Sequence, residues 1–390
     1  MAGMKVAIKP AILNWILQKI QFENVASSAL ELLTKWQSGE KTPTFNQVED
    51  VSRKINIPFG YFFLDTPPVE NCPILEYRTV NSVAIPEPSR NLIDTYDQMV
   101  EMQEWMTEYL QENGYEELNF VGIVTLDTPV NIIVKAIREH LNLNVNWFAS
   151  CKTATEAYKL ICSRVEEIGV LVMSNGIVGN NTRRKLNVDE FRAFTVVNKN
   201  APLIFINNCD TETGKLFSIM HEFTHVLLGV NSLYNDGCGH EENKSNIEKI
   251  CNAAAAEVLV PSAIFNFLWD KTDEMISAHM ETVAGYFHCS RYVIARKALD
   301  QHKISRKTYD ETVKELDKQF KAWEAEQSKN KSGGGNFYRT MSSRLDHRFI
   351  RALAQSAEEG RTQYTDLFRM TNTNRRTFQK LLNEIGGAGW

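Results

Sequence analysis

The sequence predicts an α+β protein that is mostly helical and holds one small antiparallel or mixed sheet. Three short runs, at 169–174, 192–198 and 202–208, are rich in the β-branched and aromatic residues that strands prefer. Stretches with helical spacing of apolar residues lie on both sides of them, and residues 211–327 are predicted to be almost entirely helical. With 390 residues, 43% of them hydrophobic, the chain can bury a substantial core.

The first 66 residues contain short helical segments separated by turn signals. Gly39 and Pro43 interrupt the apolar periodicity. Thr44 and Gln47, three residues apart, form a capping-box pattern at the start of the third segment. We therefore expect a small helical module at the N-terminus.

Proline and glycine divide the chain further. A proline-rich stretch without helical periodicity is predicted to be an extended connector before a long helix. The run SKNKSGGGN is predicted to be a flexible linker before a basic helical module. The predicted parts are the helical module at 1–66, the connector and helix at 67–120, the strand-containing domain at 121–262, a helical subdomain at 263–327, the linker at 328–336 and the basic module at 337–390.

Charge and composition argue against several classes of protein. The 43 Lys and Arg residues against 48 Asp and Glu residues leave a net charge of -5, so a surface that binds nucleic acid throughout is not expected. No apolar run has the length of a membrane span and the N-terminus lacks the pattern of a secretion signal, so we expect a cytoplasmic protein without membrane attachment. Seven scattered cysteines are expected to be reduced thiols, mostly in the core.

One motif carries recognisable chemistry. His221, Glu222 and His225 form H-E-x-x-H, which on a helix places two imidazoles one turn apart on the same face, where both can bind one Zn²⁺. Glu222 lies beside the metal position and can accept a proton from the attacking water. The surrounding apolar residues predict a buried helix, in which three polar side chains are costly unless something binds them. The alternative is a pair of core histidines satisfied by hydrogen bonds, with Glu222 in an ion pair.

A catalytic zinc site needs a third protein ligand, and the downstream segment SNIEKICNAAAAEVLVP offers Glu248 and Glu257. Nine residues apart on a helix, these two point to opposite sides, so only one can face the metal. We favour Glu248, because Asn252 one turn later can then reach a ligating histidine as an outer partner.

Other interpretations stay open at this point. Ser245 and Glu248 also form a capping-box pattern, which would use the carboxylate at the helix N-terminus. Cys238 and His240 could bind a metal, but they lack a partner at ligand spacing. The strand at 202–208 is either a core strand or a sheet edge that binds a peptide by strand addition.

The strand ending in Asn, followed by HEFTH and then by EKICNAAAAEVLVP, resembles the ImmA/IrrE metallopeptidases, and the preceding segment GNNTRRKLNVDEFRAFTVVNKNAPLIFINN resembles the same family. The resemblance implies a zincin-like fold for residues 121–262 and Zn²⁺ as the cofactor. It assigns the metal to His221, His225 and Glu248, and the role of base to Glu222.

The match has visible departures. The family's later helix usually has Ala where Cys251 stands here, and Phe where Ala254 stands, changes that affect packing more than metal binding. The stretch TKWQSGEKTPTFNQVEDVSRKINIPFGYFFLDTPP resembles the end of an XRE-type helix-turn-helix, but the recognition-helix region around FENVASSAL is short. Residues 1–66 also have nearly balanced charge, so a packing or docking role is favoured over DNA binding there.

Two further segments are helical candidates for partner binding. VAGYFHCSRYVIARKALDQHKIS, within 263–327, is similar to a helix-turn-helix and is expected to pack beside the catalytic domain. The basic module at 337–390 could contact nucleic acid or an acidic partner, or could simply present a solvated helical face.

The resemblance implies a zinc-dependent endopeptidase that cleaves specific cytoplasmic proteins, above all an XRE-type repressor, and so derepresses a mobile-element, defence or stress regulon. One alternative is a non-catalytic, peptidase-like regulatory or toxin–antitoxin binding protein. Another is a DNA-binding transcriptional regulator. The intact pair of histidines around Glu222 argues against a scaffold, which needs no base.

Overall fold

The computed structural model describes residues 4–20, 27–68, 88–234, 246–270, 276–329 and 341–386. The chain divides into two compact units, one within residues 1–73 and 88–93 and the other within 74–87 and 94–390. The second unit contains the sheet and both helices that carry the predicted metal ligands.

The first unit is a small helical module built from α1 (Pro10–Lys19), α2 (Ser27–Gln37), α3 (Phe45–Ile55) and the short 3-10 helix η2 (Phe59–Phe63). The predicted capping box is confirmed, because Gln47 N donates to the Thr44 hydroxyl while Thr44 N donates to Gln47 Oε1 at 3.0 Å. The inner faces of these helices share one apolar cluster, which includes Ile12, Ile16, Leu33, Val48, Val51 and Phe62.

The second unit contains a four-stranded mixed sheet in a mostly helical fold, as predicted. Its strands are β1 (Leu171–Asn175), β2 (Ala193–Val196), β3 (Leu203–Asn207) and β4 (Ser232–Tyr234), in the order β1-β3-β2-β4. β1 and β3 are parallel, whereas β2 is antiparallel to both β3 and β4.

The structure decides one open alternative about the strands and corrects one expectation. Because β3 is paired on both sides, the strand within 202–208 is a core strand, and strand addition to it is excluded. The helical prediction for 211–327 is wrong at β4, where Ser232–Tyr234 pair with β2 immediately after the long buried helix ends. Three residues are too few to show a strand period, so the pairing partner decides their conformation.

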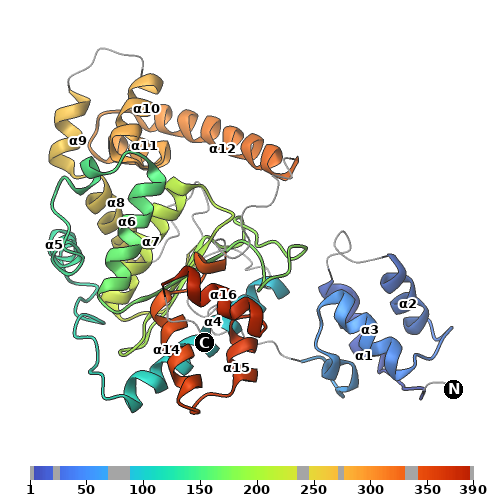
Figure 1. Ribbon diagram of the computed structural model, residues 1–390. Helices are drawn as coiled ribbons and strands as arrows, with labels where there is room; N and C mark the ends of the chain where they lie inside the picture. Colours follow the sequence, from blue (N-terminus) through green and yellow to red (C-terminus); the bar gives the residue numbers. More distant parts are fainter. Residues whose placement is uncertain are drawn as a thin grey trace. The chain divides into compact units, whose positions relative to one another are not determined.

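The helices of the second unit are α4 (Arg90–Glu112), α5 (Val130–His140), η4 (Trp147–Ser150), α6 (Ala154–Glu167), α7 (Glu212–Leu228), α8 (Asn246–Leu259), α9 (Ser262–Trp269), α10 (Ile276–Phe287), α11 (Arg291–Asp300), α12 (Arg306–Lys329), α14 (His347–Glu358), α15 (Tyr364–Met370) and α16 (Arg375–Glu384). The unit includes α4 only from Asp94 on, and among these helices α6 and α7 pack against the sheet. Figure 1 shows α6, α7 and α8 side by side, and α7 also packs against β2 and β3.

The two faces of the sheet contact different parts of the chain. Alternate residues of a strand point to opposite faces. Thr195 therefore faces α7, where it bonds Glu222, while the next residue back, Phe194, stacks on Phe205 at 4.9 Å between ring centroids. On that second face the Tyr96 ring of α4 lies 5.6 Å from Phe194. The α7 face belongs to the largest apolar cluster of the unit, so α7 lies in the core.

The C-terminal helices pack onto the same unit. Ser174 N in β1 donates to Arg344 O at 2.8 Å, and the Arg348 side chain donates to Val170 O at 2.7 Å. Ser328 and Lys329, predicted as the start of the linker, still belong to α12, and residues 330–336 of the predicted linker lie outside the described residues.

Most of the described cysteines lie in the apolar core or pack against it, as expected. Among the described residues, Cys251 and Cys289 are buried, whereas Cys151, Cys162 and Cys209 are partly exposed, and all five are free thiols. In the part of the chain that the structure describes, no individual helix has both the length and the apolarity of a bilayer span; α8 and α9 meet these criteria only as a pair bent by 61°.

A half-buried carboxyl near the C-terminal helices leads to a pH-dependent prediction. Burial and the neighbouring charge of Asp346 raise the pKa of Glu166 in α6 to about 7. Asp346 is fully buried and caps α14 by accepting hydrogen bonds from Arg348 N and Phe349 N. Between the unfolded pKa near 4.5 and the folded value, the folded state binds more protons, so stability falls as pH rises through this window.

We therefore expect Glu166→Gln to stabilise the protein above about pH 7 and to have little effect below about pH 4.5. Because Glu166 is partly exposed, the free energy of unfolding at high pH should rise by about 1–2 kcal/mol, less than the full free energy that corresponds to its pKa shift. Urea unfolding of the parent and the variant, at pH 4.5 and above pH 7, measures this difference in stability. An equal difference at both ends would contradict the assigned pKa.

Candidate metal centre

α7 positions the two histidines of the motif in the core. The Thr211 hydroxyl caps its N-terminus by accepting from Gly214 N, and Gly229 ends it in the left-handed conformation at φ 69°. A side chain at Gly229 would also meet the Gly122 backbone at 3.1 Å, so glycine is required there for two reasons. Between these ends, His221 and His225 are 0% and 1% exposed.

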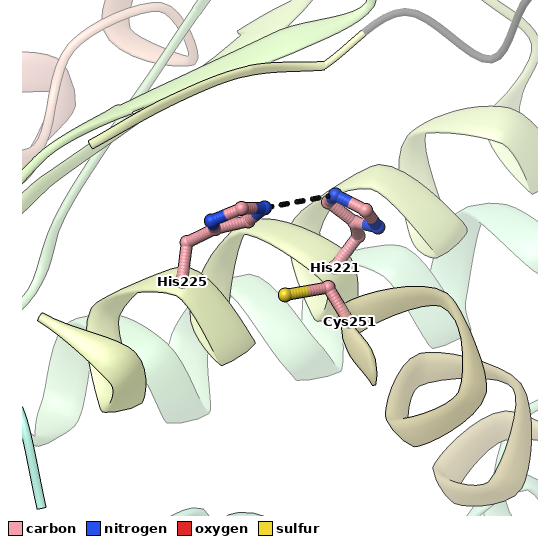
Figure 2. A group of neighbouring side chains, drawn as sticks. All are labelled: His221, His225 and Cys251. Atoms are coloured by element: carbon pink, nitrogen blue, oxygen red, sulfur yellow. Dashed lines mark hydrogen bonds between the residues drawn. The ribbon is translucent and has the colours of Figure 1, made fainter. Parts of the chain in front are cut away.

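The two imidazoles converge as the i, i+4 spacing predicts. His221 Nε2 and His225 Nε2 are 3.1 Å apart, and the rings lie next to each other on the same face of α7 (Figure 2). Nitrogens bound to one tetrahedral Zn²⁺ at about 2.0–2.1 Å are separated by roughly this distance.

Glu248 approaches the same point from α8. One carboxylate oxygen is 3.2 Å from His221 Nε2 and the other is 3.3 Å from His225 Nε2. α8 packs closely against α7, and the buried residues of α8 include the small side chains Ala254 and Ala255. Burial disfavours the charge of Glu248, but the two imidazoles lower its pKa below the usual range, so the carboxylate is ionised.

Asn252 determines which nitrogen of His221 carries the proton. Its Oδ1 is 3.0 Å from His221 Nδ1 and accepts a hydrogen bond from that N–H. In the neutral ring, this hydrogen bond leaves the lone pair of His221 Nε2 free, 3.2 Å from a carboxylate oxygen of Glu248. An imidazole nitrogen with a free lone pair beside a carboxylate oxygen is a pair of metal ligands, so the residues fit a divalent metal.

A second observation points the same way. Among the described residues, His225 Nδ1 and Glu222 Oε1 are buried polar atoms without a hydrogen-bond partner. Unpaired buried polar atoms are uncommon in folded proteins, and a catalytic role is one explanation for them.

Glu222, the residue after His221, is held by two hydroxyl groups from the sheet. Thr195 Oγ1 donates to Glu222 Oε2 at 2.5 Å, and the Ser232 hydroxyl donates to the same oxygen. Thr195 in β2 and Ser232 in β4 lie directly opposite each other in the sheet, so the pairing of the two strands brings both hydroxyls to Glu222. Burial raises the pKa of Glu222, and the two hydroxyls and His225 offset only part of this effect.

Sequence reasoning missed both hydroxyl residues. Neither belongs to a motif, and Ser232 lies in the strand that the sequence did not predict. Their role follows only from the pairing of two strands distant in sequence, β2 and β4, over the face of α7.

Glu257 lies elsewhere. Its carboxylate pairs with Lys297 and accepts a hydrogen bond from Ser262 N at 3.0 Å. The structure therefore brings Glu248, and not Glu257, to the two imidazoles. Ser245, Cys238 and His240 lie outside the described residues.

Cys251 is an additional donor at the site. Its sulfur and a nitrogen of each of His221 and His225 all lie within 4.8 Å of one another, and Figure 2 shows the sulfur close to the two rings. It follows Glu248 by three residues on the same helix face, a signal that is visible in the sequence. Burial and the carboxylates of Glu248 and Glu222 raise the pKa of Cys251 well above its usual value, which favours Glu248 as the third ligand.

Comparisons with known proteins place this site in a family. The model of a peptidase M78 family, described as the IrrE N-terminal-like domain, matches residues 165–299. A second model, for a domain of unknown function named DUF8813, matches residues 345–384. Searches of curated proteins and of solved structures gave no match. Residues 165–299, which include α7 and α8 and thus every donor described above, are therefore an IrrE N-terminal-like domain of the M78 metallopeptidases.

Proposed function

We propose that this protein is a zinc-dependent endopeptidase. The observation that carries the proposal is the convergence of His221 Nε2, His225 Nε2 and the Glu248 carboxylate on one point, with Glu222 next to them in the sequence and held by two hydroxyls. Two imidazoles and one carboxylate are a ligand set of catalytic zinc, which needs a fourth position open to substrate.

Zinc bound by these residues would act as a Lewis acid, polarising the scissile carbonyl and making water more acidic. His221 is oriented for this role by Asn252, which fixes the ring and leaves Nε2 unprotonated. The α7–α8 contact holds the imidazoles and Glu248 in place, so little rearrangement is needed when metal binds.

Glu222 acts as the proton carrier. Oε2 is engaged by Thr195 and Ser232, while Oε1 has no partner among the described residues and is the oxygen that can accept the proton of the attacking water. A pKa raised by burial favours retention of that proton until it passes to the leaving amine.

For the substrate, we propose specific cytoplasmic proteins, above all repressors of the XRE type, cleaved at a limited number of bonds. The support is the sequence resemblance to ImmA/IrrE metallopeptidases together with the M78 domain match. Cleavage would release transcription of a mobile-element, defence or stress regulon.

Metal removal and readdition test the proposal. Incubation with a chelator, followed by dialysis, should abolish cleavage of a proteome-derived peptide library and of repressors encoded beside this gene. Readdition of zinc should restore cleavage of both substrates, because zinc is the Lewis acid of the proposed reaction. Mass spectrometry of new peptide ends measures the effect. Cleavage that persists unchanged in metal-free protein would exclude zinc catalysis.

A further inference from the structure

The C-terminal helices present a polar face that the peptidase site does not use. α15 and α16 are joined by four residues, Thr371–Asn374, which is the connection length of a helix-turn-helix. α14 precedes them, and the domain of unknown function at 345–384 coincides with these three helices.

The turn between α15 and α16 is well defined. Asn372 adopts the left-handed conformation at φ 51°, and Asn374 caps α16 by accepting from Thr377 N at 2.9 Å. Below the turn, Leu367 of α15 and the α16 residues Phe378 and Leu381 are almost fully buried. α16 is therefore fixed on one side and free to face outward on the other.

The outward face of α16 consists of basic and amide side chains: Arg375, Arg376, Gln379, Lys380 and Asn383. At 100° per residue these five positions cover an arc of about 140°, opposite the buried side. Arg375, Arg376 and Asn383 are exposed, and Gln379 and Lys380 are half-buried. Glu384, in the last turn, is the one acidic residue of α16.

These residue types match the edges of base pairs. Arginine donates two hydrogen bonds to guanine O6 and N7, and glutamine or asparagine pairs with adenine N6 and N7, in the major groove of DNA. Within the described part of the chain, neither Arg375 nor Arg376 has a carboxylate within ion-pair distance, so neither guanidinium is already neutralised by a salt bridge.

The other two helix-turn-helix candidates, in the N-terminal unit and at α10 and α11, lack such a face of exposed and unpaired basic side chains among their described residues. In the N-terminal unit the charges of α3 pair with one another along the helix, Arg53 with Glu49 and Lys54 with Asp50. That helix therefore offers little unpaired positive charge to a phosphate backbone.

The candidate formed by α10 and α11 is covered. α12 packs along α11, where the Tyr292 hydroxyl donates to Asp317 at 2.7 Å and Arg291 bonds Gln319. A groove-binding helix needs one exposed face, which α11 lacks. Of the three candidates, α16 alone combines exposure with arginines, Arg375 and Arg376, that have no ion pair among the described residues.

We propose that residues 345–384 bind double-stranded DNA, with the polar face of α16 in the major groove. The module is held to the rest of its unit through the turn, because Gln98 donates to Met370 O at 3.1 Å and Asn180 donates to Asn372 O at 2.7 Å. Binding would therefore place the M78 domain at a chromosomal site. This inference is independent of zinc and of peptide hydrolysis.

Duplex binding by the full-length chain tests the proposal. The parent protein should bind a fluorescent mixed-sequence duplex at low salt, with an affinity that falls as salt rises. Arg375→Ala combined with Arg376→Ala should weaken binding by at least about tenfold and reduce the slope of log affinity against log salt by about 1–2. The matched control is Arg53→Ala with Lys54→Ala, which removes the same number of charges from α3 and should leave both quantities unchanged.

Groove reading is tested separately from charge. Selection from a random duplex pool should enrich a defined motif, and Gln379→Ala should alter the motif while the salt slope stays as in the parent. Circular dichroism and the melting temperature of each variant check that the module remains folded. Absence of duplex binding at low salt, or equal binding by the Arg375 and Arg376 variant, would overturn the proposal. Equal affinity for heparin and no enriched motif would also overturn it, since that outcome indicates a general polyanion contact.

Discussion

Glu222→Gln is expected to lower the rate of peptide hydrolysis by about 10³-fold while zinc remains bound, within the range that general-base catalysis contributes. The amide has the shape of the carboxyl group, and its oxygen can still accept from Thr195 and Ser232. It cannot accept and return a proton. Initial rates on a cleaved peptide, measured together with zinc content by elemental analysis, test this expectation.

The matched control is Glu257→Gln, a second Glu-to-Gln change in the same domain at a carboxylate that pairs with Lys297 instead of facing the imidazoles. It should hydrolyse peptide at nearly the parent rate. If Glu222→Gln cleaves as fast as the parent, Glu222 is not the base and the endopeptidase assignment fails. If the variant loses cleavage but keeps its effect on a co-expressed repressor, the protein acts as a scaffold that binds the repressor.

Glu248→Ala is expected to weaken zinc binding by more than about 100-fold, because loss of an outer-sphere partner alone costs about 10–100-fold. The substitution removes the negative group that contacts both His221 Nε2 and His225 Nε2. Competition with a chromophoric chelator measures the affinity. Glu257→Ala should bind zinc like the parent, and the reverse pattern would show that the other face of α8 holds the metal.

Cys251 is the competing third ligand, and cobalt substitution separates it from Glu248. If Glu248 is the ligand, the Co²⁺ protein should lack a thiolate-to-cobalt charge-transfer band, and Cys251→Ala should bind metal as tightly as the parent. An intense band that disappears in Cys251→Ala, with a loss of affinity, would instead assign the sulfur to the metal.

Local rules in the sequence account for much of the site. The i, i+4 spacing of His221 and His225 brings their rings together on any regular helix, and the helical phase of Glu248 and Glu257 requires them to diverge. The capping box of Thr44 and Gln47 is likewise a relation between residues three apart, and the structure confirms it. Each of these predictions depends on a single helix.

Errors and omissions arose where distant segments pair. β4 was predicted as part of a helical region, and the strand at 202–208 could not be distinguished from a sheet edge. The hydroxyls of Thr195 and Ser232, 37 positions apart in the chain, meet only because β2 and β4 are neighbours in the sheet. Likewise, the difference between the covered α11 and the exposed α16 depends on α12, which packs on the former.

The sequence by itself therefore determined the approach of the two imidazoles, the opposite directions of Glu248 and Glu257 and the helical character of most of the chain, because helical geometry repeats over neighbouring residues. Only the tertiary structure decided the strand order, the two hydroxyls that hold Glu222, the approach of Cys251 to the imidazoles and the face of α16 that stays exposed. These features are contacts between segments far apart in sequence, and their formation depends on how whole elements pack and not on the order of residues within any one of them.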